Sequence, residues 1–273
     1  TTAQPVANTP MVVESIYRKI DLKAMDLKEC NYCEDRYYIK ALADIELKKY
    51  KEATDLLGKF GTELGQHKLK KILVRAHNKM GDFIIADSLL SSIQITSKSH
   101  EWIELFIFNA RDLLVQDKKA MATIYLDKIM DAIDQSPDST KNLNSTILAE
   151  CLFFKKEFKQ AELLLEKILQ LQPDLIEQNA MLAIAYERNG KADKAQRQLA
   201  NLEGLRGKYQ YGDIDYAFAQ YFAAIGDDGN TTKYLIKAVA AGRWYDTTSF
   251  QNDPLLKAYS QKEDFKGVMN FSN

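Results

Sequence analysis

Apolar and polar residues along most of the chain alternate with the period of an α-helix, in short segments that end at polar breaks. The clearest segments lie between Ser145 and Gly204, where Leu148 and Leu152 are four positions apart and therefore share one helix face. The break Asn189-Gly190-Lys191 follows a second such segment, and a glycine can adopt the positive φ that ends a helix. The pattern predicts an all-α protein built from successive packed helices.

The same pattern occurs twice in this stretch, displaced by 34 residues. Ala161 and Ala195 occupy one equivalent place in the two copies, where two helices must approach closely, and Leu148 and Leu182 occupy another. Pro173 stops the second helix of the first copy. This period and these small-residue and proline positions resemble the tetratricopeptide repeat family. The resemblance implies antiparallel helix pairs that stack into a right-handed α-solenoid, a superhelix with a concave binding face.

Weaker copies on both sides extend the predicted array to about six helix pairs. The equivalent small residues are expected to be Ala53, Ala86, Ala122, Ala161, Ala195 and Thr231. Two copies deviate from the family pattern. Asp44 falls where an apolar residue is expected, and the pair that contains Ala122 lacks a glycine turn.

Three regions are predicted along the chain. Thr1 to Pro10 is small and polar and is expected to be a disordered leader, whereas residues 11–241 form the repeat domain. Residues 242–273 form a C-terminal helical cap, in which Asn252-Asp253-Pro254 starts a short helix over Leu255–Tyr259. The side chains expected to hold this cap on the last pair are Trp244, Leu255, Leu256 and Phe265.

The composition is ordinary for a globular protein, and it argues against some classes of function. The 273 residues are 46% hydrophobic, and 37 basic residues against 38 acidic ones give a formal net charge of −1. This balance argues against a chain-wide role on nucleic acid. No apolar run approaches the roughly 20 residues that span a bilayer, and no signal peptide is visible. A cytoplasmic location and a bacterial periplasmic or cell-envelope location both stay open.

Cys30 and Cys33 form the one CxxC motif. A zinc site needs further ligands, and His67, His77 and His100 are distant in the sequence. A structural or incidental role, a disulfide in an exported protein, and metal or redox chemistry therefore stay open. Cys151 lies among apolar residues and is expected to be a buried small hydrophobe.

No motif for a nucleophile, a metalloprotease or a phosphate-binding loop occurs, so no catalytic, metal or cofactor site is predicted. An enzyme with an unrecognised site is the third hypothesis, after the two interaction hypotheses below. Four tyrosines form an aromatic cluster for which core packing is expected over a binding surface, namely Tyr209, Tyr211, Tyr216 and Tyr221.

The strongest candidate for binding is a row of cations on one side of a predicted helix: Lys68, Lys71, Arg75 and Lys79. In the repeat family, such positions on the first helix of a pair often face the groove; the alternative is a solvated face. The carboxylate clamp of chaperone-binding members would place an Asn where this chain has Arg75, so that specificity is not predicted.

The function that these features favour is a non-catalytic scaffold that holds a peptide or a partner's helix in its concave groove. The alternative is a cell-envelope accessory protein for assembly or secretion with the same fold. A protein or peptide partner is expected.

Overall fold

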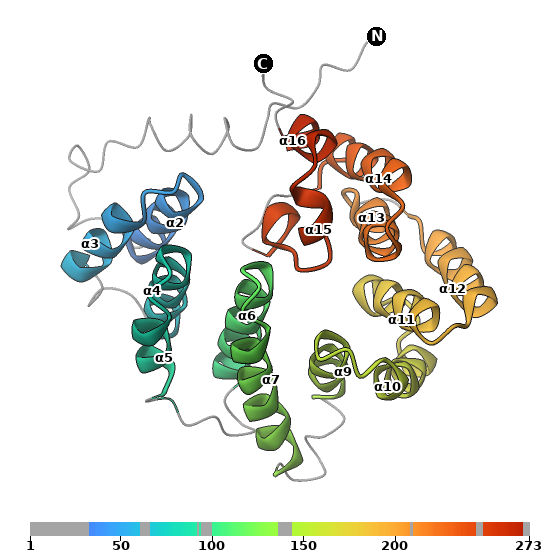
Figure 1. Cartoon of the computed structure of the whole chain (residues 1–273), viewed down its shortest axis with the longest axis horizontal. Helices are drawn as coiled ribbons and strands as arrows, with labels where there is room; N and C mark the ends of the chain where they lie inside the picture. Colours follow the sequence, from blue (N-terminus) through green and yellow to red (C-terminus); the bar gives the residue numbers. More distant parts are fainter. Residues whose placement is uncertain are drawn as a thin grey trace. The chain divides into compact units, whose positions relative to one another are not determined.

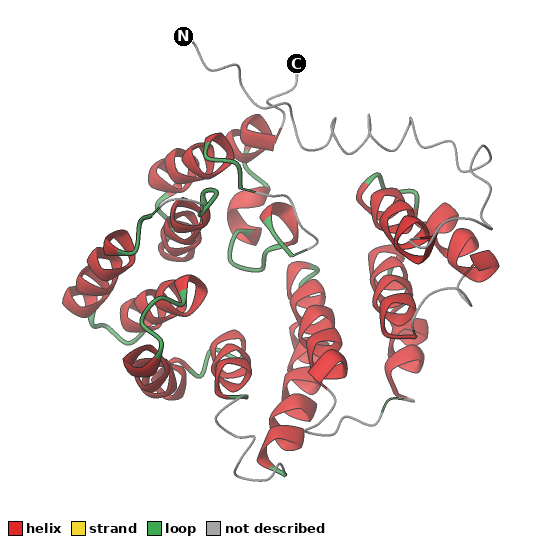
Figure 2. Cartoon of the chain, turned by 180° about the vertical axis from the view of Figure 1, so that it is seen from behind, coloured by secondary structure: helices red, strands yellow, loops and turns green. Residues whose placement is uncertain are grey.

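The structure is a computed structural model that describes residues 33–60, 66–91, 93, 100–135, 144–207, 210–243 and 248–269. Regular structure in these ranges is entirely helical, as Figure 2 shows, which confirms the predicted all-α class. The leader Thr1–Pro10 and the first expected helix, Met11–Leu27, lie outside the described residues.

Twelve of the described helices form six consecutive pairs (Figure 1). The pairs are α2 (Cys33–Glu46) with α3 (Tyr50–Phe60), α4 (Gln66–Met80) with α5 (Phe83–Ser91), α6 (His100–Val115) with α7 (Lys119–Asp134), α9 (Ser145–Phe154) with α10 (Phe158–Leu171), α11 (Ile176–Arg188) with α12 (Ala192–Gly204), and α13 (Asp213–Ile225) with α14 (Asp228–Ala240). Because two or three residues join the helices of each pair, the two helices run antiparallel. We number these pairs one to six.

One turn geometry recurs in all six pairs. Each turn contains one residue with a φ between 60° and 86°, namely Lys48, Gly81, Asp117, Lys156, Gly190 and Gly226. In each turn the next N–H also donates to the carbonyl five residues earlier, as Lys191 does to Tyr186 and Asp227 to Phe222. This is the Schellman ending of a helix. Pairs one, three and four therefore have the same turn as the glycine-containing pairs, although their turn residue carries a side chain.

The predicted small residues follow each turn residue by five positions and are buried. Ala53, Ala86, Ala122, Ala161, Ala195 and Thr231 are all 0–2% exposed. A larger side chain at these places would push the two helices of a pair apart. The recurring turn and the recurring small residue show that the same helix-pair unit occurs six times in the part of the chain that the structure describes. Asp44, which departs from the pattern, is buried and pairs with Lys40 one helical turn earlier.

The chain divides into two compact units within α7, between Tyr125 and Leu126. In the first unit α4 packs on both α2 and α6, so the first helices of pairs one to three form a continuous layer. A core between pairs one and two contains Ala41, Ile45, Leu57 and Ile72.

In the second unit, α11 packs on α9 and on α13, which again places the first helices of successive pairs side by side. After α14 come a 3-10 turn, η3 (Phe250–Asn252), and two short helices, α15 (Lys257–Ser260) and α16 (Glu263–Met269). These tail elements share a buried core with α13 and α14 that includes Tyr216, Leu235, Phe250, Leu256, Tyr259 and Phe265. Trp244 lies outside the described residues.

The short tail helix begins later than the sequence predicts. A helix is expected over Leu255–Tyr259, whereas α15 begins at Lys257. The Asp253 carboxylate accepts a hydrogen bond from the Leu255 N–H at 2.9 Å, which holds residues 254–256 in a turn. This local side-chain bond competes with helix formation, as aspartate does in other turns.

Candidate interaction surface

The layer of first helices in the first unit brings the four predicted cations to one place. They lie on α4, between α2 on one side and α6 on the other. Lys68 Nζ lies 5.8 Å from the ring centre of Tyr38 on α2, and Lys71 Nζ lies 4.6 Å from that of Phe108 on α6. Stacking of this kind orients a cation over an aromatic face and adds modest stabilisation. The row therefore bridges successive first helices.

Arg75 differs from the lysines because it is buried. Its side chain is only 1% exposed, and its guanidinium carbon lies 5.1 Å from the Phe108 ring centre. Lys68, Lys71 and Lys79 are half-buried. The sequence left open that all four cations lie on a solvated helix face. Arg75 does not, because it packs within the layer between α4 and α6.

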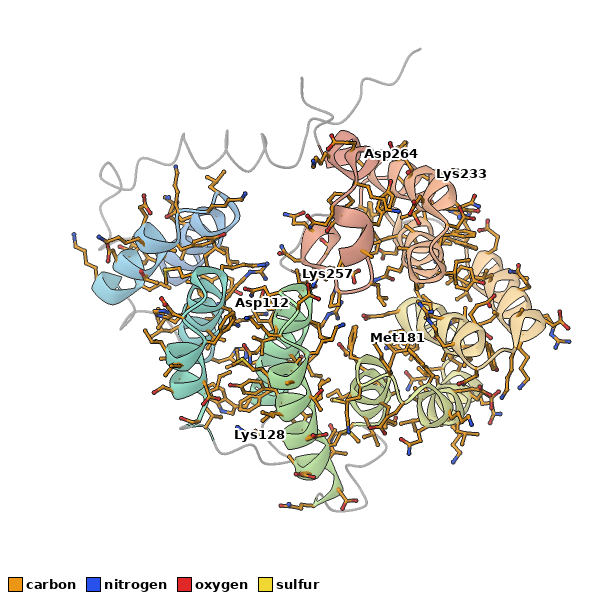
Figure 3. All side chains as sticks on the ribbon, viewed as in Figure 1. Asp112, Lys128, Met181, Lys233, Lys257 and Asp264 are labelled. Carbon is orange, nitrogen blue, oxygen red and sulfur yellow. The ribbon has the colours of Figure 1, made fainter. Side chains whose placement is uncertain are left out.

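A polar network continues from the cation row toward α6. Lys79 Nζ lies 3.2 Å from the Oδ1 of Asp112, which is buried on the side of α6 that faces α4 (labelled in Figure 3). One turn away, the buried Asn78 donates to the buried Asn109 at 2.8 Å. Paired polar groups of this kind fix the register of two helices, because breaking them would leave a buried group unsatisfied. The network therefore holds Lys79 in a structural contact.

The last pair shows different chemistry at the equivalent positions. Lys71 and Arg75 lie ten and six residues before the turn residue Gly81, and Tyr216 and Gln220 have the same spacing before Gly226. The Tyr216 hydroxyl and the Gln220 amide both donate to Asp253 of the tail, at 2.9 and 2.7 Å. Burial, and then the nearby Asp253 charge, raise the pKa of Tyr216 well above its usual range, so that it stays a donor. Sequence reasoning missed this contact because no local pattern links α13 to residue 253.

Of the four predicted aromatic residues, the three that the structure describes do not share one exposed surface. Tyr216 and Tyr221 are buried, Tyr211 is 56% exposed, and Tyr209 lies outside the described residues. The Tyr221 hydroxyl donates to Glu187 at 2.7 Å, which ties α13 to α11. These contacts correspond to the core packing expected for Tyr216 and Tyr221.

The cysteines offer no site in the described part of the chain. Cys30 lies outside it, and so does the side chain of Cys33. Cys151 is buried on α9, and this burial raises the pKa of its thiol, as expected of a small core residue. In the described ranges no three His, Cys, Asp or Glu side chains are grouped to hold a metal ion. No helix within those ranges is long and apolar enough to cross a bilayer.

The six equivalent turns and buried small residues define an all-α helical-repeat protein. A scan against protein-family models finds no match, and a search of the curated proteins finds none either. Among solved structures, the chain is similar to a tetratricopeptide repeat protein from Parabacteroides merdae, at 14% identity and a TM-score of 0.49, over 95% of this chain and 89% of that one. It is also similar to the C-terminal part of a TPR repeat-containing protein from Cytophaga hutchinsonii, at 16% identity and a TM-score of 0.41, over 90% and 93% of the two chains.

Proposed function

We propose that the chain is a non-catalytic scaffold that binds an acidic peptide or partner helix on the first-helix layer of its first unit. The observation that carries the proposal is the row of Lys68, Lys71 and Arg75 on α4, which reaches Tyr38 of α2 and Phe108 of α6. A segment that lies along α4 would meet positive charge from one helical turn to the next. Carboxylates of the partner would offset the mutual repulsion of the cations.

The lysines and the arginine have different roles in this proposal. Lys68 and Lys71 are half-buried, with ammonium groups over the Tyr38 and Phe108 rings. They make direct contacts with the partner. Arg75 is buried and stacks on Phe108, so it helps to hold that ring in place and adds to the positive potential of the surface.

The test uses fluorescent peptides in which Asp or Glu alternates with apolar residues, and matched peptides with Asn or Gln in their place. We expect the acidic peptides to bind, and their affinity to fall as salt rises, because exposed charges are screened over about 8–10 Å. The double variant Lys68→Ala, Lys71→Ala should bind about tenfold more weakly, since each exposed contact is worth up to about 1 kcal/mol.

The matched control removes cations from second helices instead. Lys51 on α3 and Lys119 on α7 are exposed, and the variant Lys51→Ala, Lys119→Ala has the same net charge as the test variant. It should bind the acidic peptides as the wild type does. Equal affinity of the two double variants, or binding of the amide-matched peptides as tight as that of the acidic ones, would refute the proposed surface.

A further inference from the structure

The tail of the chain lies on pair six through both polar and apolar contacts. Asp253 is completely buried and accepts hydrogen bonds from Tyr216, Gln220 and the Leu255 N–H. Phe250, three residues earlier, is 2% exposed, and its ring centre lies 5.3 Å from that of Tyr216. Leu256, three residues after Asp253, is also fully buried. Three anchors at equal spacing therefore hold this segment.

A simple hydrophobic cover for the last pair would not require a buried aspartate. Removing a carboxylate from water is costly unless hydrogen bonds satisfy it, and replacing such a group with an apolar one is often neutral or stabilising. The two donors of α13 are aimed at the carboxylate, with bond lengths of 2.9 and 2.7 Å. Directional bonds of this kind select a particular side chain, which is how a site recognises a segment.

The backbone of the segment has an unusual conformation at Phe250. Phe250 has a φ of 52°, in the left-handed region that is unfavourable for a bulky residue. Its own N–H donates to the Tyr216 hydroxyl at 2.8 Å. Ser249 and Asp253, which flank the 3-10 turn η3, have extended backbones, with ψ of 169° and 120°. The strained residue is thus held by the α13 contacts that it makes.

The two donors to Asp253 lie at positions that recur in the first helix of every pair. Tyr216 and Gln220 occupy the places that Lys71 and Arg75 occupy on α4. The residues at these two places in pairs one to six are Tyr38 and Leu42, Lys71 and Arg75, Ile107 and Arg111, Thr146 and Glu150, Ala180 and Ile184, and Tyr216 and Gln220. Pair six has two neutral hydrogen-bonding side chains there, and a carboxylate of the same chain is bound to both.

We infer that the α13 face of pair six is a second peptide-binding site, and that residues 248–261 occupy it as an internal ligand. We call this site the tail seat, defined by Tyr216 and Gln220 with the apolar residues Ala219 and Leu235. Its ligand is a partner segment with an aromatic residue, an aspartate three positions later and a leucine three positions after that. The tail competes with this partner and so regulates access to pair six. The inference rests on the proposed function in taking the first-helix face as the surface that partners meet.

The test is an exchange experiment on the full chain. The probe is a labelled peptide with the sequence of residues 248–261. The double variant Phe250→Ala, Asp253→Ala loosens the internal tail and should bind the probe at least tenfold more tightly than the wild type, whose seat is filled at a high effective concentration. A probe with Asn in place of the aspartate should bind at least tenfold more weakly, because charge-assisted bonds are lost. Adding Gln220→Ala to the loosened chain should weaken the probe, whereas adding Lys71→Ala should not.

Several outcomes would overturn the inference. One is a loosened variant that keeps the wild-type helical signal in circular dichroism and does not bind the probe. Another is loss of probe binding on Lys71→Ala, which would assign the peptide to the first unit. The acidic-peptide experiment on Lys68 and Lys71 is independent of the seat, so the two proposals fail separately. Light scattering should show a monomeric wild type; a dimer with exchanged tails would assign the seat to a second copy.

If the loosened variant does not fold, hydrogen exchange on the wild type tests whether the tail opens independently of pair six. The amides of Phe250 and Leu255, which donate to Tyr216 and Asp253, should exchange at least tenfold faster than those of Ala219 and Leu235 within α13 and α14. Equal rates would mean that the tail opens only when pair six unfolds. The tail would then be a fixed part of the core, and the inference would be wrong.

Discussion

Helices α4 and α13 occupy the same place in pairs two and six but present different chemistry. Both end in the same glycine turn, and both are followed by a buried small residue, Ala86 or Thr231. On α4 the two equivalent face positions are the cations Lys71 and Arg75; on α13 they are neutral donors bound to Asp253. The repeat therefore fixes the backbone and the helix crossings while leaving these face positions free to vary.

A substitution at Gly212 should disrupt pair six most strongly. Gly212 precedes α13 with a φ of 85°, and an added Cβ would lie 2.9 Å from the Cα of Ala238 and closer still to its carbonyl oxygen. Gly212→Ala should lower the free energy of unfolding of the second unit by about 3 kcal/mol or more, from backbone strain and overpacking together. Urea unfolding, followed by the helical signal in circular dichroism, measures this change in the free energy of unfolding. At the equivalent place α4 has His67, so pair two does not depend on a glycine there.

Gly229→Ala is the matched control for this prediction. Gly229 lies in the first turn of α14, where an added Cβ would lie 3.8 Å from the Asp227 Oδ1, an ordinary van der Waals contact. The same substitution should be neutral or stabilise by up to about 1 kcal/mol, because alanine favours a helix. Similar effects of the two substitutions would contradict the close approach of Gly212 to α14.

Arg75→Ala should be the most damaging change among the four cations of pair two. The buried side chain packs on Phe108, so its removal leaves a cavity and should cost about 2–4 kcal/mol. Arg75→Met keeps most of the volume and should cost less than about 1.5 kcal/mol. Thermal unfolding of the two variants beside Lys71→Ala, which should be near neutral, separates packing from charge. A melting temperature unchanged by Arg75→Ala would refute its burial.

Ala195→Leu tests the crossing that all six pairs share. Ala195 is 0% exposed between α11 and α12, and a leucine would overpack the crossing at a cost of about 1–3 kcal/mol. Gln196→Leu, at the next and exposed position, is the control and should change stability little. Chemical denaturation of both variants provides the comparison. Equal stability of the two would count against a close helix crossing at Ala195.

The fold was predictable from the sequence where only a small side chain satisfies the geometry. The buried crossings require small side chains, so Ala161 and Ala195 reveal the period directly. The turns of pairs one, three and four were harder to predict, because Lys48, Asp117 and Lys156 adopt a positive φ that is normally a glycine signal. Tertiary packing of the two helices overrides that local preference.

The candidate sites were predictable only in part, for a different physical reason. Helical spacing places Lys68, Lys71 and Arg75 on one side of α4, which is a local property of the sequence. The burial of Arg75 depends on Phe108, 33 residues later, and the binding of Asp253 depends on Tyr216, 37 residues earlier. Contacts between distant segments leave no periodic signal, so neither could be derived from the pattern.

The smallest expected effect concerns the shared turn, through Lys156→Gly in pair four. Pairs two and six both use glycine at this place, whereas Lys156 adopts a φ of 65° at a conformational cost of about 1–2 kcal/mol. Glycine removes that strain but loses more entropy on folding, by about 0.5–1 kcal/mol. The net result should be a gain in stability of about 0.5–1 kcal/mol, measured by urea unfolding. The reverse change in pair five, Gly190→Lys, should cost a similar amount. If Lys156→Gly destabilises the second unit, the lysine side chain contributes to the turn, and the six turns are not equivalent in energy.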